Sequence, residues 1–399
     1  MPWKECDQVS LRVELLTLAG QQGAGFSELC RRFGVSRKTG YKWLRRFQRE
    51  GAAGLSDRSR RPARSPRRTS GRMEALVLSV REQHPAWGGR KIRARLLTLG
   101  YHGVPSASTI TAILQRHGRL DPAESLKRGP MQRFERSAPN ELWQMDFKGD
   151  FAMGNRRRCH PLTVLDDHSR FSIGLRACAN QQYQTVRQEL TGLFKRYGLP
   201  QAMLMDNGTP WGVTHGRGGG YTRLAAWLLR LNVRVIHGRP YHPQTQGKQE
   251  RFHRTLKVEL LRDSWYRNLR QAQGAFDPWR DMYNFERPHE ALGMEVPVSR
   301  YRPSERTMPD RLPPLEYGPG IVLRKANPVG QVSFKGRLLK VSEAFGGDAI
   351  GFRPTRCDGV YDVLYAGFHV GRADLRGVPS GKQAEVRLRS LRSLQRTSA

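Results

Sequence analysis

The stretch ELWQMDFKGDF, residues 141–151, decides the fold of this chain. Large apolar residues alternate with polar ones in it, which is typical of a strand because successive side chains of a strand point to opposite faces. Trp143, Met145 and Phe147 therefore share one face, and Asp146 lies on the other. The stretch predicts a strand that packs on one side and presents a carboxylate on the other.

Strands and helices alternate after this first strand. We expect two more strands at 158–171 and 172–179, and then a helix, strand, helix, strand and helix at 185–198, 201–206, 221–232, 233–238 and 247–261. Three consecutive strands followed by alternating strands and helices favour a mixed five-stranded sheet with helices on its faces, an RNase H-like α/β arrangement. We assign this core domain to residues 140–300.

Residues 1–55 predict a helix-turn-helix domain of three short helices. An apolar stripe on the first helix comes from four leucines: Leu11, Leu15, Leu16 and Leu18. The second helix is expected at 27–33, and Ser36 is a good N-cap for a third helix over 37–50.

The third helix is predicted to be the recognition helix. Tyr41, Leu44 and Phe47 recur at three-residue spacing, so we expect them to face the core. Gly40 in the same helix costs about 1 kcal/mol relative to alanine. The basic residues on the outer side are predicted to contact DNA: Arg37, Lys38, Lys42, Arg45 and Arg46. The alternative is a three-helix bundle whose basic face is only solvated.

Three further segments separate this domain from the core. Residues 56–72 contain seven arginines, two prolines and no large apolar residue, which is typical of a basic linker. Residues 73–118 predict a second helix-turn-helix-like domain, whose last helix begins at Ser106 or Ser108. That helix is expected to pack inward through Ile110, Ile113 and Leu114. Residues 119–139 form a second linker.

The C-terminal part of the chain changes to short strands. Residues 315–375 carry six short apolar stretches separated by turn signals, which favour a small β-barrel domain. Residues 376–399 are rich in arginine and are expected to form a basic disordered tail. The whole chain is therefore predicted to be a multidomain α+β protein.

The charge of the chain indicates its partner. Its 399 residues include 69 Lys and Arg but only 35 Asp and Glu, which gives a formal charge of +34. Such an excess opposes compaction unless a polyanion screens it, and phosphate contacts gain affinity by releasing counterions, so nucleic acid is expected. The five cysteines lack CxxC spacing and support neither a disulfide framework nor a zinc site. No apolar run is long enough to span a membrane, and no signal sequence begins the chain.

Three carboxylates fall on separate elements of the predicted core. Asp146 projects from the first strand, Asp206 ends the strand 201–206, and Glu250 lies in the first turn of the helix 247–261. Sites assemble at the carboxyl ends of strands in open α/β sheets, and the positive end of a helix dipole favours an ionised glutamate. Two Mg²⁺ ions about 3.5–4 Å apart, held by carboxylates, can activate an attacking oxygen and stabilise a leaving one. We predict that these three acids hold two Mg²⁺ ions, with Mn²⁺ as an alternative.

Cations follow the predicted metal-binding glutamate. Arg254 and Lys257 come four and seven residues after Glu250, on the same helix face, and are placed to bind a DNA phosphate beside the scissile bond. The alternative for Arg254 is an ordinary ion pair with Glu250. Three residues in and just after the preceding loop are further predicted DNA contacts, unless the loop is purely structural: Arg239, Gln244 and Lys248.

Other acids and histidines in the core are weaker candidates for a metal site. Asp166 and Asp167 fall in the expected turn between two strands, where Asp is common for backbone reasons. Asp150 lies near a strand end. His237 and His242 are expected to shape the loop before the last helix or to touch DNA rather than bind a metal.

Five stretches taken together resemble a known family. WQMD at 143–146, LDDHSR at 165–170, MDNG at 205–208, RPYHPQTQGKQERFHRTL at 239–256 and NFERPHEALG at 284–293 are similar to bacterial insertion-sequence transposases with a retroviral-integrase-type DDE core. The resemblance implies that Asp146, Asp206 and Glu250 are the catalytic triad and that Lys257 matches the basic position after the glutamate. Retroviral integrases also carry an N-terminal zinc module, which is absent from this sequence.

The resemblance implies a DNA transposase. It would bind the terminal inverted repeats of its mobile element and catalyse metal-dependent strand cleavage and strand transfer, that is, DNA integration and recombination. Its partners would be double-stranded DNA, at element ends and target, and further copies of itself on that DNA, without a membrane. We expect it in the bacterial cytoplasm, associated with the nucleoid. Two alternatives stay open: a catalytically inert DNA-binding regulator or element remnant, and a stand-alone RNase H-like nuclease.

Overall fold

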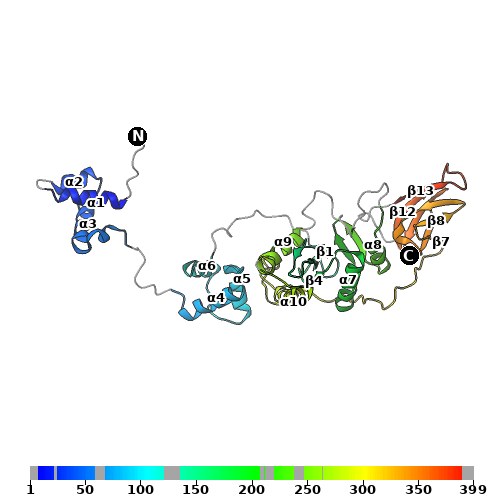
Figure 1. Cartoon of the computed structure of the whole chain (residues 1–399), viewed down its shortest axis with the longest axis horizontal. Helices are drawn as coiled ribbons and strands as arrows, with labels where there is room; N and C mark the ends of the chain where they lie inside the picture. The colour runs from blue at the N-terminus through cyan, green and yellow to red at the C-terminus, as the bar shows by residue number, and fades with distance from the viewer. Residues whose placement is uncertain are drawn as a thin grey trace. The chain divides into compact units, whose positions relative to one another are not determined.

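The computed structural model describes residues 8–21, 25–58, 68–120, 135–206, 211, 220–237, 247–262 and 264–388. The chain divides into two compact units, residues 1–68 and 69–399 (Figure 1). In the described part of the chain, no helix has both the length and the apolar character needed to cross a membrane.

The first unit is a bundle of three helices, α1 (Gln8–Ala19), α2 (Phe26–Arg32) and α3 (Arg37–Glu50), followed by the 3₁₀ turn η1 (Gly51–Leu55). Ser36 caps α3 as predicted, since its hydroxyl accepts the Thr39 N–H at 3.2 Å. Leu15 and Leu16 of α1 are buried, whereas Leu11 is 41% exposed. The apolar stripe of α1 is therefore narrower than predicted.

The buried face of α3 differs from the predicted one. Tyr41 and Phe47 are 44% and 42% exposed, whereas Trp43 is only 5% exposed and lies in the core of the unit. Its ring is covered by cations at 3.8, 4.4 and 5.0 Å from the ring centroid, which belong to Arg12, Lys42 and Arg46. A cation over an indole face gains attraction from the ring quadrupole. The tryptophan thus takes the inward position, and two of the predicted DNA contacts lie partly over it.

Helices α2 and α3 approach closely at Gly40. A Cβ atom at this position would lie 2.5 Å from Cys30 Sγ and 3.2 Å from the Phe26 ring. A larger residue at position 40 would have to displace the side chains of Cys30 and Phe26. The packing of the two helices therefore explains a glycine that weakens α3 when the helix is considered alone.

The second unit begins with the helices α4 (Gly71–Gln83), α5 (Gly89–Thr98) and α6 (Ala107–Arg116). Ser106 rather than Ser108 is the N-cap of α6, and its hydroxyl accepts the Thr109 N–H at 3.2 Å. The residues of α6 that were predicted to face inward are all buried: Ile110, Ile113 and Leu114. Together with apolar residues of α4 and α5 they form a small separate core.

The central sheet contains the five predicted strands, β1 (Trp143–Phe147), β3 (Arg158–Asp166), β4 (Ser172–Cys178), β5 (Ala202–Met205) and β6 (Arg234–His237). A sixth, two-residue strand, β2 (Phe151–Ala152), pairs with the start of β3. Strand β1 lies between β3 and β5, while β4 pairs with β3 and β6 pairs with β5. The pairs β1–β3 and β3–β4 are antiparallel and the pairs β1–β5 and β5–β6 are parallel, so the sheet is mixed, as predicted.

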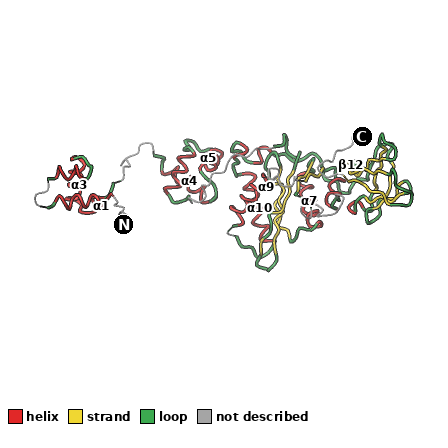
Figure 2. Tube along the Cα trace, turned by 90° about the horizontal axis from the view of Figure 1, so that it is seen from above, coloured by secondary structure: helices red, strands yellow, loops and turns green. Residues whose placement is uncertain are grey.

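Helices cover both faces of the central sheet (Figure 2). On one face α7 (Tyr183–Tyr197) and α8 (Arg223–Arg230) share a core with the apolar side chains of β1. On the other face α9 (Gly247–Leu256), its continuation η4 (Lys257–Leu261) and α10 (Leu269–Phe285) pack on β3 and β4. Because β1 is the middle strand of a middle layer, both of its faces are covered.

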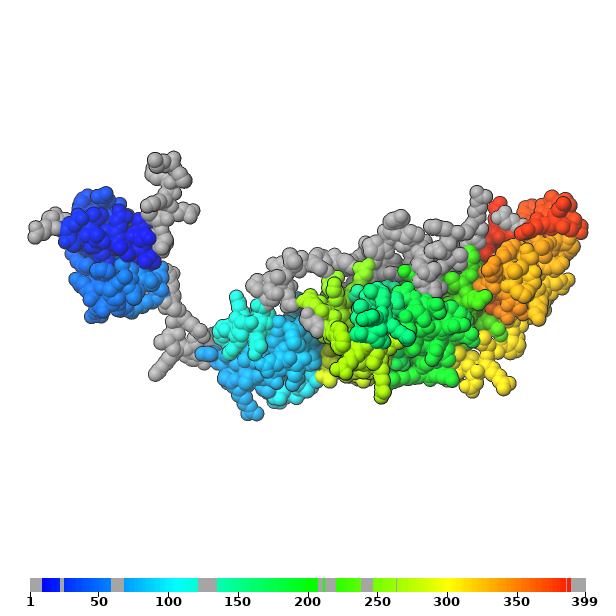
Figure 3. Space-filling model, viewed as in Figure 1, coloured from blue at the N-terminus to red at the C-terminus, as the bar shows by residue number. Residues whose placement is uncertain are grey.

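The small helical core contacts the end of α10 within the second unit (Figure 3). Arg95 of α5 donates to Glu286 at 2.6 Å, and Met282 packs against the apolar cluster of α4–α6. Arg90 makes a longer ion pair with Glu290 at 3.4 Å. The contact is therefore built mainly from ion pairs around one apolar side chain.

Seven strands form a second sheet at the C-terminal end of the second unit: β7 (Val322–Lys325), β8 (Gln331–Phe334), β9 (Arg337–Lys340), β10 (Ala349–Pro354), β11 (Val360–Tyr365), β12 (Phe368–Asp374) and β13 (Gln383–Leu388). Their order is β7-β10-β11-β12-β13-β9-β8. Strands β7 and β8 are the two ends of this order, and no pairing joins them in the described part of the chain. The predicted small β-barrel over 315–375 is therefore not shown as a closed barrel.

The last strand corrects the prediction of a disordered tail over 376–399. Residues 383–388 form β13, which pairs antiparallel with β12 and parallel with β9. Arg387 lies in this strand, so the arginine-rich composition of the segment did not imply disorder at these residues. Alternating Ala384 and Val386 supply the buried side chains of the strand. The rest of the predicted tail, 389–399, lies outside the described residues.

Candidate active site

Asp146 lies on β1, on the face that α9 covers. Across the sheet its partner is Thr163 of β3, whose hydroxyl donates to the Asp146 carbonyl at 2.8 Å. One carboxylate oxygen accepts the Phe147 N–H at 2.8 Å, and the other lies 3.9 Å from His253 Nδ1. Since its side chain remains 25% exposed, the carboxylate is partly enclosed but still accessible to a ligand.

The carboxylate of Asp206 interacts electrostatically with that of Asp146. It directly follows β5, the parallel neighbour of β1, so both acids belong to the same region of the sheet. Burial, and after it the negative charge of Asp206, raises the pKa of Asp146 to about 6. The main chain of Asp206 is held by His237, whose Nδ1 donates to the Asp206 carbonyl at 2.6 Å.

Glu250 lies in the first turn of α9, as predicted, and is exposed. The residues beside it attach the helix to the sheet. Gln249 is buried, and its Nε2 donates to the Gln144 carbonyl at 3.0 Å. His253 is also buried, which lowers its pKa to about 3, so the ring is neutral and its Nε2 donates to the Thr163 hydroxyl at 2.8 Å. Glu250, which directly follows the buried Gln249, therefore lies beside the buried, sheet-facing side of the helix and not on it.

The structure brings two of the three predicted acids together and leaves the third apart. Within the described residues, no three His, Cys, Asp or Glu side chains are close enough to hold one metal ion. Asp146 and Asp206 act on each other, whereas Glu250 is on the exposed side of α9. A site made from all three acids requires Glu250 to turn toward the other two.

The donor groups fit a hard divalent cation. Asp146 and Asp206 are neighbouring carboxylates, and their mutual repulsion disfavours ionisation. A divalent cation relieves this repulsion and prefers oxygen ligands. The burial that raises the pKa of Asp146 also strengthens the attraction between its ionised form and a cation.

The exposed side of α9 carries the two predicted phosphate-binding cations. Arg254 and Lys257 are both exposed, like Glu250. The buried side of the same helix carries Phe252 and Leu256. Beyond Leu256 the helix changes from α to π, with the Arg262 N–H bonded to the Lys257 carbonyl, so the regular helix predicted over 247–261 ends five residues early.

The other predicted DNA contacts have different surroundings. Lys248 lies 2.5 Å from Asp167 Oδ1, and its side chain is 16% exposed, so it already has a protein partner. Arg37, Lys38 and Arg45 of α3 are exposed. Arg239 and Gln244, like His242, lie outside the described residues.

Three residues near the acids were not singled out in the sequence: Thr163, Gln249 and His253. Thr163 is fully buried in the middle of β3, where alternation alone gave it no special position. Gln249 and His253 are four residues apart on one side of α9, the spacing of a helix face that packs. This polar pair lies next to an apolar pair at 252 and 256. The combination could have predicted a helix whose buried side also makes hydrogen bonds to the sheet.

The weaker acidic candidates have structural partners. Asp150 forms an ion pair with Arg158 at the surface. Asp166 is fully buried and accepts the Asn140 N–H at 2.8 Å and the Ser169 hydroxyl at 2.6 Å. Asp166 therefore serves the turn between β3 and β4, as its position in the sequence predicted.

Family models match most of the described chain. A helix-turn-helix domain matches residues 11–63 and a homeodomain-like domain matches 39–114. The integrase core domain matches residues 136–243 and, in a second model, 231–297. The C-terminal domain of the IS481 family transposases matches residues 322–378.

Relatives with similar sequences are proteins of insertion elements. The insertion element IS476 uncharacterized 39.2 kDa protein of Xanthomonas euvesicatoria is 28% identical over 260 residues, which is 64% of this chain and 71% of that protein. The insertion element IS407 uncharacterized 31.7 kDa protein of Burkholderia multivorans is 26% identical over 231 residues, 56% of this chain and 79% of that protein.

Among solved structures, the chain is similar to the simian T-cell lymphotropic virus intasome in complex with PP2A regulatory subunit B56 gamma. The two are 13% identical with a TM-score of 0.35, over 81% of this chain and 99% of that chain. Helix-turn-helix modules before an integrase core, and a transposase C-terminal domain after it, are found here in one chain with relatives encoded by insertion elements. The comparisons therefore support an insertion-sequence transposase that carries helix-turn-helix domains and a retroviral-integrase-type core.

Proposed function

We propose that this transposase is catalytically active, binds the terminal inverted repeats of its element, and uses Asp146, Asp206 and Glu250 to hold divalent metal for strand cleavage and strand transfer. The observation that carries the proposal is the placement of two carboxylates in one region of the sheet: Asp146 lies partly enclosed on β1, and Asp206 directly follows the parallel neighbour β5. Burial and the charge of Asp206 accordingly raise the pKa of Asp146. Two carboxylates held near each other repel, which costs folding free energy, and such perturbed acids are typical of functional sites. A bound divalent metal ion would offset this cost.

The residues of the site have distinct roles in this proposal. Two Mg²⁺ ions, or Mn²⁺ in their place, would lower the pKa of an attacking water and stabilise the leaving oxygen. Asp146 and Asp206 would bind from the sheet, and Glu250 from α9. Thr163 and His253 orient Asp146 by fixing its main chain and the helix opposite. Because no side-chain nucleophile is needed, the same site serves cleavage by water and transfer to a freed 3′-hydroxyl.

Two sets of cations would contact the DNA, one in α3 and one near the acids of the core. The exposed cations of α3, chiefly Arg37, Lys38 and Arg45, would contact the repeat, as helix-turn-helix modules do. Arg254 and Lys257 would contact the phosphate beside the scissile bond, and Arg239 and Gln244 the DNA near it. Two element ends must meet for strand transfer, so we expect a homo-oligomer assembled on DNA, in the cytoplasm near the nucleoid.

The experiment is a nicking assay on a duplex that carries the inverted repeats flanking the coding region. Wild-type protein with Mg²⁺ should nick the duplex at the element end, and Asp206→Asn should lose about 100-fold or more in rate, since even a group that only supports a metal ligand typically contributes about 10- to 100-fold. Asp150→Asn is the matched control, because Asp150 is an acid of the same domain that is paired with Arg158. Equal nicking by Asp206→Asn and wild type would refute the assignment.

The same assay separates the two alternatives. A precleaved element end should be joined to target DNA, and a stand-alone nuclease would give nicks without joined products. An inert regulator would bind the repeat and give neither product with Mg²⁺ or Mn²⁺.

A further inference from the structure

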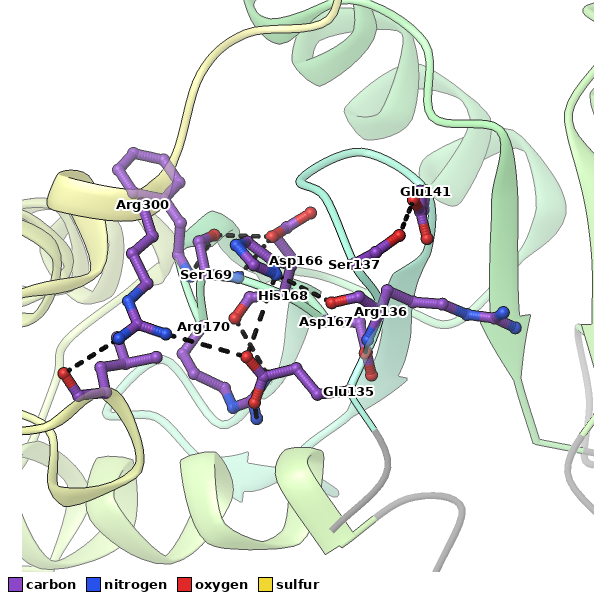
Figure 4. A network of polar contacts seen from close by, with 12 residues as sticks. Glu135, Arg136, Ser137, Glu141, Asp166, Asp167, His168, Ser169, Arg170 and Arg300 are labelled. Atoms are coloured by element: carbon purple, nitrogen blue, oxygen red, sulfur yellow. Dashed lines mark hydrogen bonds and ion pairs between the residues drawn. The ribbon is translucent and has the colours of Figure 1, made fainter.

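The turn between β3 and β4, residues 166–170, is the centre of a network of polar contacts (Figure 4). Arg170 forms an ion pair with Glu135 at 2.8 Å, and the His168 ring bonds to the Arg136 carbonyl at 2.8 Å. These contacts fix the chain just before β1. The network therefore joins the beginning of the core to the middle of the sheet.

The two adjacent acids of this turn have different partners. Asp166 accepts hydrogen bonds from within the turn and from Asn140, so it stabilises the turn itself. Asp167 is 5% exposed and faces the other way. Its Oδ1 accepts Gln144 Nε2 at 2.6 Å, and its Oδ2 accepts the Arg136 N–H at 2.9 Å.

The third partner of Asp167 comes from the catalytic helix. Lys248, the second residue of α9, lies 2.5 Å from Asp167 Oδ1 and also donates to the Asp167 carbonyl at 3.1 Å. The two side chains are only 16% and 7% exposed, so water screens the pair weakly. Lys248 precedes Glu250 by two residues, and within the part of the chain that the structure describes no other ion pair ties the first turn of α9 to the rest of the core.

From this geometry we propose that Asp167 is a positioning residue: through Lys248 it fixes the first turn of α9 and so sets where Glu250 can reach. This inference rests on the proposed role of Glu250. Gln249 supports the same turn, since it donates to the Gln144 carbonyl while Gln144 itself donates to Asp167. Lys248 is thereby assigned to the protein framework instead of to DNA.

The far end of the same helix offers a matched control. Glu259 of η4 and Arg287 form an ion pair at 3.0 Å, and both side chains are 8% exposed. This pair is as buried as the pair of Asp167 and Lys248 but lies at the other end of the helix. Breaking it removes a comparable contact without touching the first turn of α9.

The first measurement is hydrogen exchange on the metal-free full-length protein. Asp167→Asn and Lys248→Met should each speed exchange of the amides of residues 251–254, which bond to the carbonyls of the first turn, by about 10-fold or more, while those of α7 stay at the wild-type rate. Lys248→Arg, which keeps the charge, should restore protection. Glu259→Gln should speed exchange near 257–262 only. Unchanged protection at 251–254 in Lys248→Met would overturn the proposal.

The second measurement is the Mn²⁺ concentration that gives half-maximal nicking of the repeat duplex. Groups that orient a metal ligand typically change metal affinity by about 10- to 100-fold, so Asp167→Asn should raise this concentration by that factor, and Glu259→Gln should not. An equal rise in Glu259→Gln would show general loosening and refute a specific role for Asp167. If wild-type protein does not nick DNA at all, the proposed function fails, while the exchange measurement still decides the position of α9. If Asp167→Asn fails to fold, Lys248→Met decides both measurements.

Discussion

At the scale of single residues, burial disfavours the charged forms of the titratable side chains at the site. Asp146 is enclosed by β3 and α9, beside a second acid, and its pKa is raised to about 6. His253 is neutral because burial lowers its pKa to about 3. His253 therefore offers Asp146 no compensating positive charge, and the charge of Lys148 offsets only part of the effect of burial and of Asp206.

Replacing Asp146 by Asn should stabilise the metal-free protein at neutral pH by roughly 1–3 kcal/mol. The folded state binds the Asp146 proton more tightly than the unfolded state, so wild-type stability falls as pH rises from 3.8 to about 6 and stays lower above that. The gain of Asp146→Asn should therefore be full above pH 6 and vanish below about pH 4. Denaturant unfolding at pH 4, 5, 6 and 7.5 measures it.

Asp150→Asn supplies the control for that series. Its pKa is lowered by the hydrogen bond and charge of Arg158, so this substitution should give no gain at any pH. A loss of stability in Asp146→Asn at pH 7.5 would contradict the account of the site.

At the scale of elements, α9 is a helix whose two sides do different work. The buried side contacts polar atoms of β1 and β3 through Gln249 and His253, and the exposed side carries Glu250, Arg254 and Lys257. Buried polar contacts whose partners are satisfied make a structure more rigid, so the hydrogen bonds of Gln249 and His253 help to fix the rotation of α9. The orientation of the exposed side thus depends on the buried one.

The close contact of α2 and α3 gives a prediction for the first unit. Gly40→Ala should destabilise this unit by about 1–3 kcal/mol, although alanine favours helices, because the added Cβ would lie 2.5 Å from Cys30 Sγ. Gly192→Ala in α7, where nothing lies within 4 Å of the added atom, should instead gain up to about 1 kcal/mol. Differential scanning calorimetry of the full chain measures both changes, and stabilisation by Gly40→Ala would show that the helices can separate at no cost.

At the scale of the whole molecule, the C-terminal sheet depends on its last strand. Strand β13 lies between β12 and β9, and β8 is joined to the order only through β9. A chain that ends after Lys382 should lose amide protection in β8 and β9, and one that ends after Leu388 should keep it. Hydrogen exchange of the two truncated chains measures this, and equal protection in both would refute the strand order.

Local rules predicted the central part of the fold because local and global preferences agree there. Alternation in 143–147 gave the buried row of β1, and the serine before α3 gave its N-cap. Asp146 and Glu250 follow from the same rules, since strand faces and helix turns can be counted along the sequence. The mixed sheet followed from the order of the elements alone.

Predictions from the sequence were wrong or incomplete where a contact with a residue distant in sequence decides the position of a side chain. The spacing of Tyr41 and Phe47 favoured an inward row, but Trp43 is buried under cations, one of which comes from α1. For Lys248, which was predicted to contact DNA, local spacing gave no sign of the pairing with Asp167, which joins residues 81 positions apart. The approach of Asp206 to Asp146 likewise depends on β5 pairing with β1, which no local pattern specifies.

The place of β13 also has a consequence for the time course of synthesis. Because the hairpin of β8 and β9 joins the other strands through β13, the sheet stays in two parts until translation has passed Leu388. Domains fold as their residues emerge from the ribosome, so the helices and the central sheet can form first. The C-terminal sheet is then completed only after residues 383–388 have emerged, and a product that ends before them would carry the acids of the core without a complete C-terminal sheet.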